Sequence, residues 1–196
     1  MMTKLLEGGL EVTAVHNHLL RAAPATFYVH VGGHGDPVKM GEVIRGALAM
    51  SKTPLTAPAP DTPPAIDLDT AQLDSIMGAK GQANGGVYQF TVPRRDPVTE
   101  EGMTVPAAMG SAHAINFQPT GRGKAAITGD FVLAADEVGP LVRALKSTGI
   151  DVTAIHSHML TEQPRMIFAH FWANDNALTL AKGVRAALDK TRVARN

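Results

Sequence analysis

The chain has 196 residues, of which 44% are hydrophobic and 18% are charged, and its 18 basic side chains balance its 18 acidic ones. This composition indicates a globular protein with one large or two small domains, and the zero net charge argues against nucleic acid or an anionic membrane surface as a partner. Because cysteine is absent, disulfides, thiolate metal sites and cysteine nucleophiles are excluded. Any bound metal would need imidazole, carboxylate, carbonyl or water ligands.

An internal repeat organises the chain. The segment from Gly9 to Leu48 aligns without a gap with the segment from Gly149 to Leu188, at a constant offset of 140 residues. Seven of the identical pairs are Val12/Val152, Thr13/Thr153, His16/His156, His18/His158, Pro24/Pro164, His30/His170 and Arg45/Arg185. We interpret the match as an internal duplication of a strand-turn-strand-helix unit.

Hydrophobic periodicity and turn residues predict the elements in chain order. Met1–Glu7 is expected to be the end of a helix, and the first histidine hairpin and its helix follow it. Residues 51–66, rich in Pro and Ala, are predicted to form a linker. Beyond it the patterns predict a helix over Asp67–Ala79, strands over Val87–Arg94, Ala112–Pro119 and Lys124–Leu133, a helix over Asp136–Ser147, strands over Asp151–Leu160 and Arg165–Ala173, and a helix over Ala177–Lys190.

We therefore divide the chain into a partial first repeat (1–50), the linker (51–66) and a complete second repeat (67–196). The expected fold class is α+β, a mostly antiparallel sheet with helices packed on one face. Since the first repeat lacks three strands that the second contains, we expect it to be either truncated or completed by a partner that covers its sheet edge. A homodimer would supply such a partner. No apolar run is long enough to cross a bilayer, and no signal peptide is visible.

Histidines are the candidate functional residues. Seven of the eight lie in the two repeated hairpins: His16, His18, His30, His34, His156, His158 and His170. Side chains two residues apart on a strand share a face, so each His-x-His pair points one way, and the returning strand brings a third imidazole nearby. Three imidazoles on one face are typical of a transition-metal site with open positions, and we predict zinc, iron or copper. The eighth, His113, alternates with apolar residues and is expected to face the core.

Three functions stay open from the sequence. The first is a metal-dependent enzyme acting on a small molecule, with Asp36, Asp130 or Asp175 as nearby carboxylates. The second is a noncatalytic metal-binding protein. The third is a small-molecule or partner-binding module in which the histidines are structural or respond to pH. An enzyme requires a carboxylate and a substrate pocket beside the metal, whereas a carrier requires neither.

Several motifs together resemble the LppY/LpqO family of bacterial proteins. They are TAVHNHLL, HVGGHGDP, QANGGVYQFTVPRRDP, MTVPAAMG, INFQPTGRGKAAITGDFVL, TAIHSHML and MIFAHFWANDNA. The resemblance covers nearly the whole chain. It implies two similar halves and frequent export or lipid anchoring, but no activity, because the function of that family is unknown. Against the family pattern we expect the first repeat to be truncated, and His113 stands where a small residue is expected.

Overall fold

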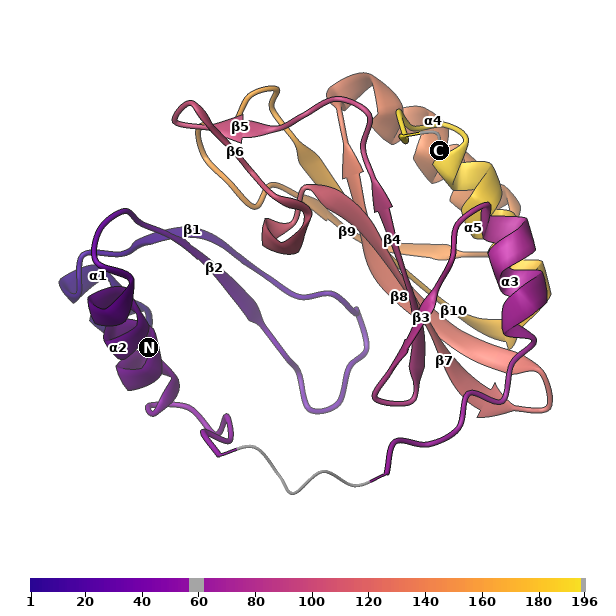
Figure 1. Cartoon of the computed structure of the whole chain (residues 1–196), viewed down its shortest axis with the longest axis horizontal. Helices are drawn as coiled ribbons and strands as arrows, with labels where there is room; N and C mark the ends of the chain where they lie inside the picture. The colour runs from indigo at the N-terminus through magenta and orange to yellow at the C-terminus, as the bar shows by residue number, and fades with distance from the viewer. Residues whose placement is uncertain (57–61, 195–196) are drawn as a thin grey trace.

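The computed structural model describes residues 1–56 and 62–194, and it has the predicted α+β class (Figure 1). All pairings between its strands are antiparallel in these two ranges. Of the predicted linker, residues 57–61 lie outside the described residues, and 51–56 and 62–66 contain neither helix nor strand. None of the helices in the described ranges combines the length and apolarity needed to cross a bilayer.

The N-terminal unit consists of one hairpin and two helices. Its elements are α1 (Met2–Glu7), β1 (Glu11–His16), β2 (Tyr28–Gly32) and α2 (Pro37–Leu48). Helix α2 begins directly after Asp36, because the Asp36 side chain accepts hydrogen bonds from the N–H groups of Val38 and Lys39. Only Leu5, Leu10 and Ala47 are fully buried in the core of this unit.

The remaining elements form a six-stranded sheet with three covering helices. They are α3 (Thr70–Met77), β3 (Gln82–Asn84), β4 (Val87–Pro93), β5 (Thr99–Glu100), β6 (Met103–Thr104), the 3-10 turn η1 (Ala107–Met109), β7 (Ala112–Gly121), β8 (Lys124–Leu133), α4 (Ala135–Ser147), β9 (Asp151–His156), β10 (Ile167–Asn176) and α5 (Ala177–Leu188). The strand order in the sheet is β3-β4-β7-β8-β10-β9.

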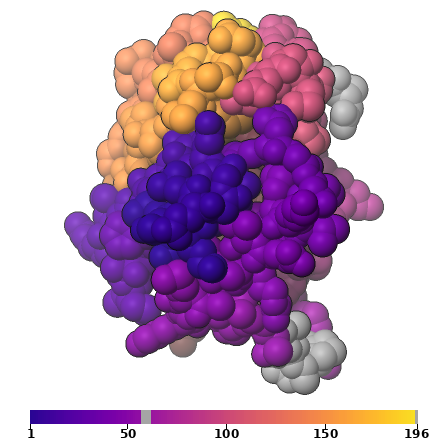
Figure 2. Space-filling view, turned by 90° about the vertical axis from the view of Figure 1, so that its left-hand side faces the viewer, coloured from indigo at the N-terminus to yellow at the C-terminus, as the bar shows by residue number. Residues whose placement is uncertain are grey.

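The two faces of this sheet have different environments. One face packs Ile115, Phe131 and Phe171 against α3, α4 and α5, and this is the main hydrophobic core. The opposite face looks toward the β1–β2 hairpin (Figure 1). Seen from that side, the N-terminal unit, drawn in indigo and purple, lies in front of the rest of the molecule (Figure 2). Side chains that alternate away from the core therefore point at the N-terminal hairpin.

Most predicted elements are present, with differences at their ends. Strand β8 has the predicted bounds, whereas β9 ends at His156 rather than Leu160, and β10 extends to Asn176 rather than Ala173. The β9–β10 ladder ends early because the Met166 N–H donates to the Glu162 carboxylate instead of the facing strand. The short elements β3, β5, β6 and η1 were not predicted.

The hairpin-and-helix segments match at the offset found in the sequence. β1 and β9 begin at Glu11 and Asp151, and α2 and α5 begin at Pro37 and Ala177, each pair 140 positions apart. Both first strands also carry an irregularity in their pairing, between Val12 and Ala14 in β1 and at the equivalent place in β9. Such a bulge changes which side chains face the neighbouring strand.

Candidate metal centre

The two hairpins bring six of the predicted histidines into one cluster. We call the following set the histidine cluster: His16, His18, His30, His156, His158 and His170. Its rings form three stacked pairs across the two hairpins, with centroid distances of 3.7 Å for His16 and His156, 3.8 Å for His18 and His170, and 3.8 Å for His30 and His158. The structure thus places both sets of imidazoles together.

The arrangement is close to twofold symmetric. His16 and His156 occupy equivalent positions at the 140-residue offset and stack on each other. The same offset relates His18 to His158 and His30 to His170, so it converts one of the other two stacked pairs into the other. Aromatic rings at equivalent positions flank the cluster, with Tyr28 stacked on His18 and Phe168 stacked on His158, both at 3.6 Å. The sequence did not lead us to predict these two flanking rings. An aromatic residue at both positions, 140 residues apart, could have indicated them.

Each His-x-His pair lies at the end of a first strand. His16 and His156 are the last residues of β1 and β9, and His18 and His158 follow in the turn. The rings within each pair stay close, with centroids 5.1 Å apart for His16 and His18 and 4.8 Å apart for His156 and His158. The expected common direction of the two side chains is therefore kept even though the strand ends between them.

Backbone carbonyls fix the protonation of three rings. The Nδ1 atom of His16 lies 3.2 Å from the Asn17 oxygen, and His156 makes the equivalent contact with Ser157. The Nδ1 atom of His170 lies 3.0 Å from the Gly129 oxygen. Because a carbonyl only accepts, Nδ1 must carry the proton, and Nε2 keeps its lone pair. Metal-binding histidines typically have this outer hydrogen bond.

Among the residues that the structure describes, three buried Nε2 atoms have no hydrogen-bond partner, those of His156, His158 and His170. A fourth ring joins them, since His16, His156, His158 and His170 each offer a ligand atom within 4.8 Å of the others. A second, overlapping group contains His18, Asp130 and His170. Leaving a buried polar atom unpaired costs about 1–3 kcal/mol, so three such atoms in one cluster require a physical explanation. A bound cation would supply one.

Burial favours the neutral form of five of the six rings in the histidine cluster. It lowers the pKa of His18 and of His156 to about 4, and the pKa of His158 to about 2. The pKa values of His16 and His30 are lowered for the same principal reason. A neutral imidazole is the form that coordinates a metal, so these rings are ready to act as ligands at neutral pH without first losing a proton.

Asp130 is the carboxylate of the site. It lies on β8 directly opposite His170 on β10, and its Oδ1 atom is 2.9 Å from His170 Nδ1. Among the described residues, however, Asp130 Oδ1 makes no hydrogen bond of acceptable geometry. The contact between His170 Nδ1 and the Gly129 carbonyl does have such geometry, so we infer that the Nδ1 proton is donated to that carbonyl. Burial alone would raise the pKa of Asp130, but contact with His170 and the other imidazoles outweighs it and lowers that pKa.

Other predicted ligands and carboxylates lie away from the cluster. His34 does not join it, because the turn after β2 directs its ring to the surface, where Nε2 pairs with Glu101 at 2.9 Å. Asp36 caps helix α2. The exposed side chain of Asp175 lies 3.9 Å from Lys124. Of the three carboxylates considered from the sequence, Asp130 is therefore the one in the site.

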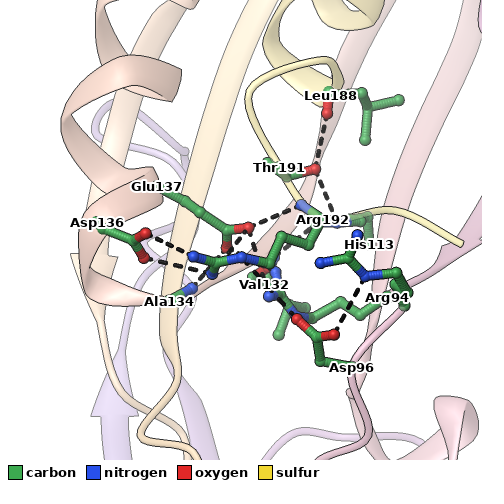
Figure 3. Close-up of polar contacts among 11 residues, drawn as sticks. Arg94, Asp96, His113, Val132, Ala134, Asp136, Glu137, Leu188, Thr191 and Arg192 are labelled. Atoms are coloured by element: carbon green, nitrogen blue, oxygen red, sulfur yellow. Dashed lines mark hydrogen bonds and ion pairs between the residues drawn. The ribbon is translucent and has the colours of Figure 1, made fainter.

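His113 belongs to a separate, buried polar network shown in Figure 3. Its Nδ1 atom accepts a hydrogen bond from the Val132 N–H at 3.0 Å. Nearby, Arg94 and Glu137 form an ion pair of 2.7 Å between side chains that are only 2% and 4% exposed. Burial lowers the pKa of His113 to about 3, helped by the charge of Arg94. His113 thus faces the core, as expected, and supports the fold rather than the cluster.

Comparison with known proteins gives a family but no activity. A family model described as a Domain of Unknown Function (DUF1259) matches residues 1–50 and 71–190. The unmatched stretch between these ranges contains the predicted linker. Neither a curated protein nor a solved structure matches the chain.

Proposed function

Because the chain belongs to the DUF1259 family, whose function is unknown, its chemistry must be inferred from the histidine cluster, and we propose that it binds a divalent transition metal there. The ligands are His16, His156, His158 and His170. The observation that carries the proposal is that these four rings each offer a ligand atom within 4.8 Å of the others, while three of them have a buried Nε2 atom without a hydrogen-bond partner among the described residues. An imidazole-rich site suits zinc, iron or copper.

We further propose that the metal serves a reaction on a small molecule. Two features favour an enzyme over a carrier. Asp130 provides a carboxylate in contact with His170, and a cavity is lined both by Asp130 and by His158 of the cluster. A metal held by neutral imidazoles polarises a bound oxygen or lowers the pKa of a bound water. Zinc would favour hydrolysis, and iron or copper would favour oxygen chemistry.

The alternative is a purely structural stack of imidazoles. Ring stacking and the carbonyl contacts support that alternative, because they stabilise the hairpins without a metal. It does not account for the unpartnered Nε2 atoms, each of which would have to be left without a hydrogen bond inside the protein. We therefore favour the metal.

Elemental analysis of the protein purified without chelator tests the proposal. We expect about one zinc, iron or copper per chain, and near-complete loss when His156 and His158 are both replaced by Ala. His34→Ala is the matched control, since it removes an exposed histidine outside the cluster and should keep the metal. Circular dichroism would establish that the double variant folds. A protein that contains no metal, and takes up none when zinc, iron or copper is supplied, would refute the proposal.

Other sequence-based interpretations remain proposals. The equal offsets of strands and helices support an internal duplication. We also propose, on the motifs quoted above, that the chain groups with the LppY/LpqO proteins. The three-part division of the chain and the homodimer stay predictions.

A further inference from the structure

A cavity of about 410 Å³ lies next to the histidine cluster. His158, Asp130 and Phe168 form its wall on the cluster side. The rest of its lining is Thr91, Ala107, Ala108, Gly110, Ala112 and Ala114. We propose that this cavity binds a small, uncharged hydroxy compound, an alcohol or phenol, whose hydroxyl group donates to Asp130. Its role as a substrate pocket rests on the proposed metal function, whereas its ligand class rests on the cavity itself.

Strand register explains how the cavity forms. Thr91 on β4, Ala114 on β7 and Asp130 on β8 are paired across neighbouring strands, so their side chains lie in one row on the open face of the sheet. His170 on β10 continues the row. Along this row the Thr91 hydroxyl group comes first, the Ala114 methyl group second and the Asp130 carboxylate third, and the imidazoles of the cluster follow. Small side chains in the middle of the row leave space that larger ones would fill.

The turn η1 forms another wall. It is followed by Gly110, whose positive φ of 94° suits glycine, and a Cβ atom built there would lie 4.0 Å from His158 Nδ1. Gly110 thus lies close to the cluster. Ala107 and Ala108 are exposed at this edge, which places them at the rim of the cavity rather than in its floor.

Size limits the ligand. A protein cavity of roughly 150 Å³ is sufficient to hold benzene. The cavity beside the cluster is larger, about 410 Å³, and it accommodates a single substituted ring or an aliphatic molecule of similar bulk. Apolar side chains dominate its lining, which favours an apolar body for the ligand.

Charge limits the ligand further. Asp130 is the acidic side chain in the lining, and it lies in the same row as Thr91 and Ala114. A carboxylate there repels an anionic ligand, and the mostly apolar remainder of the lining disfavours burial of a charged group of either sign. A neutral hydroxyl group satisfies both, because its hydrogen can be donated to Asp130 while its oxygen remains available on the side of the histidines.

Titrations with phenol and toluene, followed by ligand-observed NMR, test the proposal. We expect phenol to bind the wild-type protein with a Kd on the order of 1 mM, as befits a ligand of this size. Asp130→Asn removes the charge but keeps the shape, and it should weaken phenol binding about tenfold while leaving toluene binding within about twofold. Toluene is the matched probe because it has a ring of the same size and no hydroxyl group.

A cavity-filling variant gives a second readout. Ala108→Phe places a ring at the exposed rim, where folding is not threatened, and should weaken both probes at least about tenfold. Ala83→Phe, on the exposed strand β3 outside the cavity, is its control and should change neither. Absence of saturable phenol binding, unchanged binding in Ala108→Phe, or equal effects of Asp130→Asn on the two probes would each overturn the proposal.

Running the titrations on chelator-treated and on metal-supplied protein separates the two proposals. Phenol binding that depends on Ala108 and Asp130 in a protein that takes up no metal would support the cavity and refute the metal function. Metal uptake at the histidine cluster without phenol binding would support the metal function and refute the cavity proposal.

Discussion

Glu137 is the residue whose replacement should damage the fold most specifically. It lies in the first turn of α4, and its carboxylate accepts three hydrogen bonds of 2.7 Å, from Arg94 Nη1, the Ala134 N–H and the Arg192 N–H (Figure 3). These donors come from the end of β4, the start of α4 and the segment after α5. Glu137→Ala removes the acceptor that all three share.

The contacts set the size of the effect. Arg94 would keep its hydrogen bond to the Val132 carbonyl but lose its only buried counter-charge among the described residues. Breaking a buried ion pair in this way costs about 3–5 kcal/mol. An unpaired N–H adds about 1–3 kcal/mol where water does not reach it. The two costs together are about 4–8 kcal/mol, and at roughly 2–4 °C per kcal/mol for a chain of this length Glu137→Ala should lower the Tm by about 10–30 °C.

Thermal unfolding followed by circular dichroism measures the effect. Asp136→Ala is the matched control, because Asp136 neighbours Glu137 and pairs with Arg192, yet it is exposed and its loss should change Tm little. Glu137→Gln keeps an acceptor oxygen and should give an intermediate Tm. If Glu137→Ala unfolds at the same temperature as Asp136→Ala, the buried network does not stabilise the fold as argued.

Two further predictions concern pH and backbone spacing. Because the pKa of His113 in the folded protein, about 3, lies below its ordinary value of 6.5, stability is full above pH 6.5 and falls as pH drops toward 3. In urea unfolding at several pH values, His113→Gln should show a shallower decline, by up to about 1.4 kcal/mol per pH unit, and identical slopes would contradict this. Gly129→Ala would place a Cβ atom 1.9 Å from the Ala114 oxygen and should lower both Tm and metal content, since it separates β7 from β8 beside Asp130. Gly41→Ala on α2 meets no atom within 4 Å and should instead stabilise by up to about 1 kcal/mol; a lower Tm there would be inconsistent with the open space.

Local patterns explain what the sequence predicted. The alternation of Lys124–Leu133 was sufficient to predict both ends of β8. The same two-residue period placed His156 and His158 on one side. Each of these features depends on neighbours in the chain, and propensity and periodicity describe such neighbours well.

Long-range contacts explain what was missed. His34 has the same residue type and spacing as a ligand, but the turn after β2 and the distant Glu101 decide its position. The polar run up to Asn176 resembles a loop, yet β10 includes it because the residues continue to pair with β8 as far as Lys124. The meeting of two hairpins 140 residues apart likewise depends on packing that no local pattern encodes.

The neighbouring strand explains why two similar hairpins contribute unequally. In the second unit, β8 pairs along β10 and places the Gly129 carbonyl beside His170 Nδ1, which leaves Nε2 free for a metal. Strand β2, the counterpart of β10, pairs only with β1 in the part of the chain described, and the Nε2 atom of His30 lies 2.8 Å from that of His16. Since the Nδ1 proton of His16 is held by a carbonyl, His30 must donate this hydrogen bond, and a metal at His16 would have to displace it. The second unit thus supplies ligands whose Nε2 atoms are free, whereas the first unit supplies His16, for whose Nε2 atom the metal and the His30 ring compete.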